Sequence, residues 1–210
     1  MTESRKSQTP GRCPLRGRRI LVTRAADQAT ALSDALAARG AEPVIIPTIQ
    51  IVAPASYAGL DRAIADLGET DYLVLTSVNA VEFFFQRLST LGYDAASLDR
   101  VKIVAVGPKS AAALSAHGLQ ADLVPDDYRA EGIVAMLREQ VPGKRVLYPR
   151  AALARELIPA ELTRAGAEVV APTAYTSVLP EDAPGKLGRA LADGLDLLTF
   201  TASSTVDNFT

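Results

Sequence analysis

The sequence predicts an α/β protein with two domains, each built around a parallel sheet. Short apolar runs alternate along the chain with segments whose apolar residues recur at helical spacing. Most of the apolar runs are continuous, which is typical of strands that helices cover on both faces. In addition, one strand–helix pattern occurs twice. The alternation predicts an open sheet with right-handed crossovers, and the repeat predicts two such domains.

The strands are predicted where apolar runs end in turn residues, and helices are predicted between them. Val81, Phe84, Phe85 and Leu88 follow i, i+3, i+4, i+7 and form one apolar helical stripe. A second stripe, before the C-terminal stop expected at Gly40, consists of Leu32, Ala35, Leu36 and Arg39. The predicted strands are residues 19–23, 43–46, 72–76, 101–106, 122–124, 145–148, 168–171 and 197–200.

The composition excludes several classes of protein. Of the 210 residues, 48% are hydrophobic and 22% are charged, as in ordinary globular domains. Trp is absent and aromatic residues make up 5%, which argues against a surface that stacks nucleic-acid bases. A single Cys and a single His exclude an intrachain disulfide and a Cys/His zinc site. No apolar run approaches the ~18 residues of a membrane span, and the N-terminus lacks the apolar core of a secretory signal. We therefore expect a cytoplasmic protein that binds neither nucleic acid nor membrane.

Charge is unevenly distributed along the chain. The net charge is −2, but residues 1–19 carry +5 and the remainder −7. A body with this balance is not a general polyanion binder, so an anionic ligand would have to be held locally. Residues 1–17 are polar, basic and interrupted by Pro and Gly, which predicts a disordered tail rather than a nucleic-acid or membrane arm.

Two pairs of segments carry the repeat. The segment RRILVTRAADQ from Arg18 resembles KRVLYPRAALA, which starts 126 residues later. The segment DYLVLTS from Asp71 resembles DLLTFTA, which starts 125 residues later. Because two independent matches share nearly one offset, we infer two copies of one unit. The first copy continues well past Phe84, whereas the second reaches Thr210, so the second copy is expected to be truncated at residue 210.

Candidate binding residues lie in the turns that follow the predicted strands. In open α/β sheets, ligands bind beyond the carboxyl ends of the strands, where helix N-termini present free N–H groups. Hydroxyl and backbone groups in such turns can donate hydrogen bonds to carboxylates or phosphates. The candidates are Arg24, Thr76, Ser77, Asn79, Gly107, Lys109, Ser110, Arg150, Thr201, Ser203 and Ser204.

Each of these turns also has a structural interpretation. Ser, Thr and Asn before a helix usually cap it, so one turn alone does not indicate a site. The number of turns, with Arg24 and Arg150 in matching places of the repeat, favours a ligand. The sequence has no Walker lysine loop and no GxGxxG, so it gives no support for a nucleotide cofactor.

Taken together, these turns resemble the uroporphyrinogen-III synthase family. The resemblance covers about residues 18–210, and its order and spacing are more specific than any single segment. The segments that carry it are Leu21-Val22-Thr23-Arg24, Thr76-Ser77-Val78-Asn79-Ala80-Val81, Val106-Gly107-Pro108-Lys109-Ser110, Leu147-Tyr148-Pro149-Arg150, Ala174-Tyr175-Thr176 and Phe200-Thr201-Ala202-Ser203-Ser204.

The resemblance implies two flavodoxin-like domains joined by a two-stranded connector. Residues 18–46 and 180–210 would form one discontinuous domain, and residues 54–172 the other. Residues 47–53 and 173–179 would connect them. The family closes the linear tetrapyrrole hydroxymethylbilane, which has eight carboxylates, to uroporphyrinogen III. The reaction loses water, inverts ring D and needs no metal or cofactor.

Tyr175 is the catalytic residue that the resemblance implies. Its counterpart in the repeat is Gln50, so the repeated fold does not require a tyrosine here. A phenol with a pKa of ~10 is protonated at neutral pH and could assist departure of the substrate hydroxyl. The alternative is a ring that packs at a domain junction with its hydroxyl in water. The other candidate residues would bind the substrate in the cleft between the domains.

The sequence departs from the family pattern at two candidate turns. Ala202 stands where the family often has Ser after Thr, and Ser110 stands where Thr is common. Two other functions are compatible with two α/β lobes: a cytoplasmic small-molecule binding or regulatory module, and a glycosyltransferase, which would need a nucleotide-sugar site. For the synthase we expect a monomer that acts on a small-molecule substrate.

Overall fold

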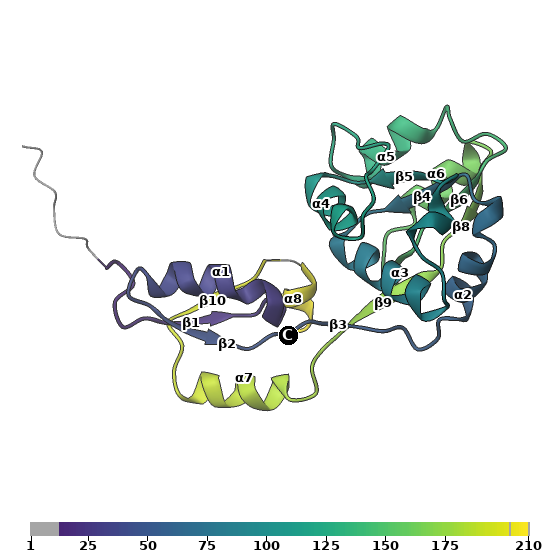
Figure 1. Cartoon of the computed structure of the whole chain (residues 1–210). Helices are drawn as coiled ribbons and strands as arrows, with labels where there is room; N and C mark the ends of the chain where they lie inside the picture. The colour runs from purple at the N-terminus through teal and green to yellow at the C-terminus, as the bar shows by residue number, and fades with distance from the viewer. Residues whose placement is uncertain (1–12, 202, 210) are drawn as a thin grey trace, which may run out of the picture. The chain divides into compact units, whose positions relative to one another are not determined.

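The chain divides into two compact units, each with its own parallel sheet (Figure 1). The computed structural model describes residues 13–201 and 203–209. Unit 1 comprises the described residues of Met1–Gln50 and Val178–Thr210, and unit 2 comprises Ile51–Ser177. The two points of division fall within residues 47–53 and 173–179.

Unit 2 contains a four-stranded parallel sheet in the order β5-β4-β6-β8. Its strands are β4 (Tyr72–Leu75), β5 (Lys102–Ala105), β6 (Arg145–Leu147) and β8 (Glu168–Val170). Its helices are α2 (Ala58–Ala65), α3 (Val78–Thr90), α4 (Pro108–Ala116), α5 (Ala130–Leu137) and α6 (Leu157–Arg164), with 3-10 turns at Leu67–Glu69 and Ala95–Leu98.

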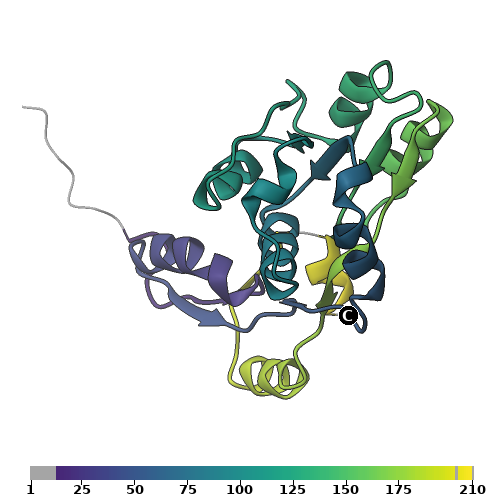
Figure 2. The same cartoon turned by 45° about the vertical axis from the view of Figure 1, so that its right-hand side comes forward.

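The strands of unit 2 bury side chains on both faces. On one face, Leu73 and Leu75 of β4 pack in a core with residues of α2, α3 and α4. On the other face, Tyr72 and Val74 pack with residues of α5 and α6. Helices flank this sheet in both ribbon views (Figures 1 and 2). Alternate residues of one strand therefore enter different cores, which explains the continuous apolar runs in the sequence.

Unit 1 contains a three-stranded parallel sheet in the order β10-β1-β2. Its strands are β1 (Arg19–Val22), β2 (Glu42–Ile45) and β10 (Leu197–Thr199). Helices α1 (Ala26–Ala37) and α7 (Ala183–Ala192) lie on opposite faces of this sheet (Figure 1), and α8 (Ser203–Asp207) follows β10. The order β10-β1-β2 matches β4-β6-β8 of unit 2, as the sequence repeat predicts.

A matching aspartate ties the first two strands of this pattern together in each unit. In unit 2, Asp71 accepts hydrogen bonds from the backbone N of Arg145 and from Nζ of Lys144, both at 2.9 Å. In unit 1, Asp196 accepts from the backbone N of Arg19 at 2.9 Å and from Nη1 of Arg18 at 2.5 Å. The repeated Asp therefore has the same structural role in both copies.

The connecting segments form a third sheet with one strand more than expected. Its order is β3-β9-β7, with β3 (Gln50–Val52), β9 (Thr173–Val178) and β7 (Arg150–Ala151). The sequence predicted only two connector strands. After Pro149 interrupts the strand pattern, Arg150 and Ala151 pair in parallel with β9 through an irregular register.

Three local predictions were wrong. Residues 122–124, which follow α4, make only an isolated bridge, between Leu123 and Val104, because a single residue of this segment pairs with β5. The buried stripe of α1 centres on Ala29 and Ser33, whereas Ala35 is exposed. Residues 13–17 of the predicted tail form turns, because their backbone groups bond to the segment after α1. Residues 1–12 of that tail lie outside the described residues.

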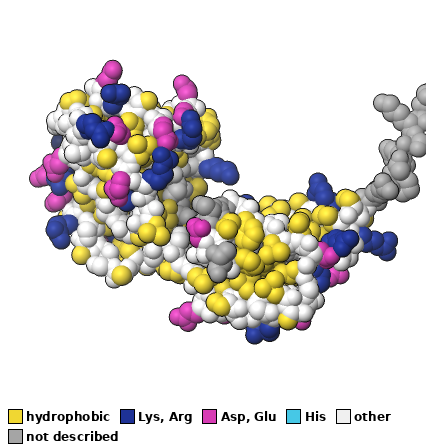
Figure 3. Space-filling model, turned by 180° about the vertical axis from the view of Figure 1, so that it is seen from behind, with side chains coloured by type: hydrophobic (Ala, Val, Ile, Leu, Met, Phe, Trp, Pro, Cys, Tyr) yellow, Lys and Arg dark blue, Asp and Glu magenta, His cyan; other side chains and the backbone are white. Residues whose placement is uncertain are grey.

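Hydrophobic side chains also gather on the surface of unit 1 (Figure 3). Leu191 and Leu197 in this unit are each 50% exposed. Strand β10 pairs with β1 on one side, whereas its counterpart β4 pairs with both β5 and β6.

Within the described residues, no helix is long and apolar enough to cross a membrane.

Candidate functional site

The candidate site lies at the carboxyl edge of the sheet in unit 2, where the strand order reverses. From β4 the chain crosses to β5 on one side, and from β6 it crosses to β8 on the other. The segments that leave β4 and β6 therefore diverge and open a crevice, which is where ligands bind in open α/β sheets. Thr76 and Ser77 follow β4, and Tyr148 follows β6.

Ser77 and Tyr175 meet at this edge, although they lie 98 residues apart in sequence. Ser77 is the N-cap of α3, and its Oγ accepts a hydrogen bond from the backbone N of Ala80 at 3.0 Å. The same Oγ lies 3.0 Å from the hydroxyl oxygen of Tyr175, which comes from β9. The structure thus brings together two of the predicted site residues.

The Tyr175 ring is held from several sides. It stacks on Phe83 of α3 with a centroid separation of 5.6 Å and an interplanar angle of 29°. The residue is 9% exposed and belongs to the core on the α3 side of the sheet. Burial raises the pKa of its phenol above 10.0, against a lowering effect of the hydrogen bond with Ser77. Tyr175 is therefore a neutral, protonated phenol at physiological pH.

Thr76 contributes to a neighbouring pocket on the other side of the same edge. Its Oγ1 lies 3.4 Å from the hydroxyl oxygen of Tyr148. Both residues line a pocket of about 260 Å³ together with Val106 of the segment after β5 and Ile158 of α6. The remaining lining residues are Tyr128, Arg129, Ala130 and Arg155.

The candidate residues in the turn after β5 differ in how deeply they are buried. Gly107 is the N-cap of α4, and a Cβ atom there would lie 3.1 Å from Cγ of Tyr128, so the glycine lets this ring approach. Lys109 is exposed in the first turn of α4. Ser110 is only 3% exposed, because it lies on the inner face of α4. Asn79 is half-buried in the first turn of α3.

The two arginines that match in the repeat are both engaged within their own units. Arg150 donates to the backbone oxygen of Ala154 at 2.8 Å and pairs with Glu156, and its side chain is only 10% exposed. Arg24 donates from Nη2 to Oε1 of Gln28 at 3.0 Å. Binding of a substrate carboxylate by Arg150 would require it to exchange these partners.

The candidates near the end of the chain belong to unit 1. Thr201 is exposed, and Ser203 and Ser204 begin α8, with side chains outside the described residues. In this unit the hydroxyl of Thr23 donates to the backbone oxygen of Thr199 at 2.8 Å. The hydroxyl that follows β1 is thus used to hold the two neighbouring strands together.

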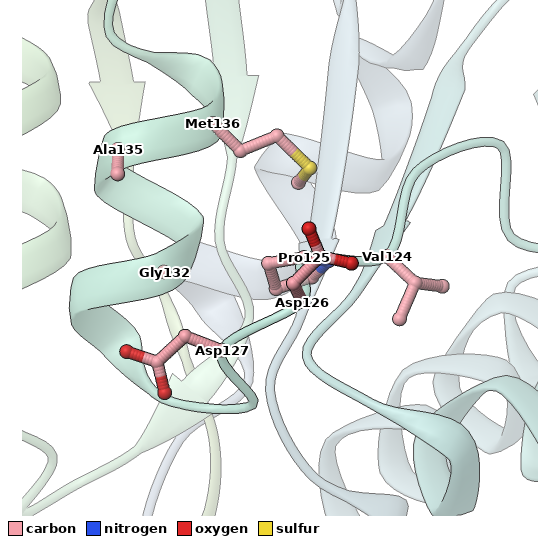
Figure 4. A pocket seen from close by; sticks show the side chains of 7 residues that line it. All are labelled: Val124, Pro125, Asp126, Asp127, Gly132, Ala135 and Met136. Atoms are coloured by element: carbon pink, nitrogen blue, oxygen red, sulfur yellow. The ribbon is translucent and has the colours of Figure 1, made fainter.

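A larger pocket in unit 2 has the wrong charge for an anionic ligand. It has a volume of about 410 Å³ and lies between α5 and the loop that carries Asp126 and Asp127 (Figure 4). Its described lining residues include these two carboxylates and no cation. Among the described residues, no group of three or more His, Cys, Asp or Glu could hold a metal ion.

Sequence reasoning missed several residues of the candidate site. Phe83 was assigned only to a helix, and Tyr148 was placed at a strand end without a role. Tyr148 could have been found, because it follows β6 as Thr76 follows β4. Tyr128 and Arg155 come from loops far from these strands, so only the fold brings them to the pocket.

Comparisons with known proteins identify the family of this chain. The family model described as uroporphyrinogen-III synthase HemD matches residues 30–210. A uroporphyrinogen-III synthase of Synechococcus elongatus is 40% identical over 93% of this chain and 75% of its own length. A putative uroporphyrinogen-III synthase of Methanothermobacter thermautotrophicus is 34% identical over 90% of this chain and 75% of its own length.

The chain belongs to the uroporphyrinogen-III synthase family. It is therefore a hydro-lyase of tetrapyrrole biosynthesis, and the substrate of the family is hydroxymethylbilane. This assignment replaces the binding-module and glycosyltransferase alternatives.

Solved structures of uroporphyrinogen-III synthases show the same fold. A structure from Thermus thermophilus superimposes with a TM-score of 0.66 at 20% identity, covering 91% of this chain and 75% of that one. One from Helicobacter pylori gives 0.57 at 19% identity, covering 92% and 76%. The expected fold class, two flavodoxin-like domains with parallel sheets, is confirmed.

Proposed function

We propose that this chain closes hydroxymethylbilane to uroporphyrinogen III with Tyr175 as the acid that assists departure of the substrate hydroxyl. The observation that carries the proposal is the Ser77–Tyr175 hydrogen bond of 3.0 Å at the carboxyl edge of β4. The first pyrrole pushes out its hydroxyl group, which takes the phenol proton and leaves as water. Ring D then attacks the resulting azafulvene through its substituted carbon. The spiro intermediate fragments and recloses with ring D inverted. The carbon-bound proton lost on rearomatisation returns to the Tyr175 phenolate, so that the net change is the loss of one water.

Either hydroxyl can donate in the Ser77–Tyr175 hydrogen bond, and the arrangement with Ser77 as donor supports a role for Tyr175 as a proton donor. The N–H of Ala80 donates to Ser77 Oγ, which leaves the Ser77 hydroxyl proton free to point at the Tyr175 oxygen. With Ser77 as donor, the phenol proton of Tyr175 can be directed at the substrate. Successive hydrogen bonds polarise one another, so the helix N–H strengthens the acid. Ser77 is then a positioning residue rather than a ligand for substrate carboxylates.

The remaining catalytic task is conformational. Pyrrole electrons drive loss of the hydroxyl, and closure without inversion competes with the correct product, so the enzyme must hold one arrangement of ring D. Thr76, Asn79, Gly107 and Lys109 are proposed to orient the substrate from the carboxyl edge of the sheet. No step of this scheme calls for a metal or cofactor.

The substitution Tyr175→Phe tests the proposal, because it keeps the ring that stacks on Phe83 and removes only the donor. Positioned acid assistance is typically worth ~10²–10⁴-fold, and we expect turnover to fall at least ~10-fold. Loss of one neutral hydrogen bond should lower the free energy of unfolding by about 1 kcal/mol. Wild-type enzyme and variant are incubated with hydroxymethylbilane, and the uroporphyrinogen isomers are separated. Unchanged turnover would leave Tyr175 with a packing role only.

We also propose that the enzyme is a cytoplasmic monomer with domains at residues 18–46 plus 180–210 and at 54–172. The exposed free thiol of Cys13 suits a reducing compartment. Light scattering coupled to size exclusion would test the monomer, and limited proteolysis within residues 47–53 and 173–179 would test the boundaries.

A further inference from the structure

The pocket beside Thr76 combines cations, an exposed ring and hydroxyl groups at the edge where the strand order reverses. We propose that this pocket is a binding subsite for one carboxylate-bearing pyrrole ring of the substrate, with Arg129 and Arg155 as its carboxylate ligands. The proposal rests on the proposed function, which supplies a substrate that carries carboxylates on every ring. It adds residues that the sequence did not indicate.

The two guanidinium groups are held weakly enough to exchange partners. Arg155 donates to Oε1 of Glu131 at 2.7 Å. Arg129 donates to both carboxylate oxygens of Asp127, at 2.7 and 2.8 Å. The Arg155 and Arg129 side chains are 70% and 72% exposed. The single contact of Arg155 with Glu131 is of the exposed kind that contributes little to stability, whereas the two-point contact of Arg129 with Asp127 is stronger. A substrate carboxylate can therefore replace Glu131 at small cost, and Asp127 only where it takes over both contacts with Arg129.

A helix N-terminus adds to the attraction. Arg129 is the N-cap of α5, and its own side chain does not cap the helix. The N–H groups of that turn and the positive end of the helix dipole favour an anion at the pocket that Ala130 lines. The helix end and the two arginines therefore act on the same ligand.

The aromatic, hydroxyl and apolar groups that line the pocket suit a pyrrole ring. Tyr128 is 59% exposed and rests against Gly107, so its ring offers a flat apolar surface. Thr76 and Tyr148 supply hydroxyl groups, and Val106 and Ile158 supply apolar contacts. A ring with a carboxylate arm can thus stack on Tyr128 while its arm reaches the guanidinium groups.

Another, larger pocket lacks these properties. It has a volume of about 550 Å³ and is lined by residues that include Arg87 and Tyr57. Arg87 donates to both oxygens of Asp61, at 2.6 and 2.7 Å, and its guanidinium lies 4.7 Å from the centre of the Tyr57 ring. Its side chain is only 24% exposed. This cation is enclosed by its partners, so it is less able to accept a substrate carboxylate.

Substitutions of the two partners of the Arg155–Glu131 ion pair should change KM in opposite directions. In full-length protein, Arg155→Gln should raise KM for hydroxymethylbilane by about 3- to 10-fold, and more than it lowers kcat, because a charged hydrogen-bond partner is lost. Glu131→Gln should lower KM by about 2-fold, because it removes the competing carboxylate. Arg138→Gln serves as the matched control, since Arg138 is exposed at the other end of α5 and outside the pocket. Added salt should reduce the difference between wild type and Arg155→Gln.

Binding of benzenehexacarboxylate, measured by titration calorimetry, provides a readout that does not depend on catalysis. Wild type should bind this probe more tightly than Arg155→Gln and as tightly as Arg138→Gln. The proposal is overturned if Glu131→Gln weakens binding as Arg155→Gln does, since the pair is then purely structural. It is also overturned if Arg155→Gln and the control behave alike. If wild type binds the probe through Arg155 but forms no isomer III, the proposed function fails while the subsite stands.

Discussion

Ser77 caps a helix and, in the proposed mechanism, also orients the phenol of Tyr175. Its Oγ accepts the N–H of Ala80 and also contacts the hydroxyl of Tyr175, each at 3.0 Å. Capping needs only an acceptor, whereas polarising Tyr175 needs a donor as well. These two requirements can be separated by substitution.

Three variants of Ser77 make that separation. Ser77→Asp keeps a good cap acceptor but cannot donate, so the phenol proton of Tyr175 should turn toward the carboxylate and the pKa of Tyr175 should rise further. We expect turnover to fall at least ~10-fold with folding stability retained. Ser77→Thr keeps both functions and should resemble wild type, whereas Ser77→Ala should lose activity and about 1 kcal/mol of stability.

The readouts are kcat with hydroxymethylbilane and ultraviolet titration of tyrosine, with Tyr175→Phe as the spectroscopic blank. Tyr148 is the other titratable group that bears on the Tyr175 phenol, and it raises the pKa of Tyr175. Equal turnover in the Asp and Thr variants would show that Ser77 acts only as a helix cap.

At the scale of elements, a carboxylate holds the first residue of β6 and, in the other unit, the first residue of β1. A backbone hydrogen bond from Arg145, followed by one from Lys144, lowers the pKa of Asp71. The backbone of Arg19, followed by Arg18, has the same effect on Asp196. The carboxylates therefore favour the folded state when they are ionised.

Asp71→Asn and Asp196→Asn should each lower the free energy of unfolding near neutral pH. Because the folded-state pKa is depressed, the stabilisation is present above the unfolded pKa of ~4 and is lost as pH falls through the folded value. The difference between variant and wild type should therefore shrink at about pH 3. Urea denaturation at the two pH values measures it, with Asp99→Asn as a control at an exposed turn. A difference that is independent of pH would count against this role.

At the scale of the whole molecule, the two units have separate hydrophobic cores. The two cores on either side of the β4 sheet consist entirely of residues of unit 2, and the core around Leu21 and Ile46 belongs to unit 1. Each unit therefore has its own apolar interior, which is the physical requirement for independent folding.

A fragment of residues 51–177 should fold alone and unfold cooperatively in urea, because it retains both of its cores. It should lack synthase activity, since Arg24 and the hydroxyl-rich turn at Thr201 belong to the other unit. Circular dichroism and the isomer assay check the two outcomes. A fragment without a cooperative transition would mean that unit 2 needs unit 1 for stability.

The local pattern of the sequence was sufficient for the fold class and for most elements. Continuous apolar runs predicted strands buried on both faces, and Leu73 and Val74 do point into different cores. The repeat predicted matching sheets, and Asp71 and Asp196 carry the same hydrogen bonds. These features could be predicted because they depend on periodicity and on residue type, which are local properties.

The composition of the candidate site was decided by the tertiary structure. Strand order places β4 beside β6, and so brings Thr76 to Tyr148, 72 residues away. The same order, with β9 in the connector sheet, brings Tyr175 to Ser77 and its ring to Phe83. The sequence by itself determined which turns carry hydroxyl groups and where a tyrosine stands. Only the folded chain decided which of these groups meet, because crossovers between strands, and not local propensity, determine which segments share an edge.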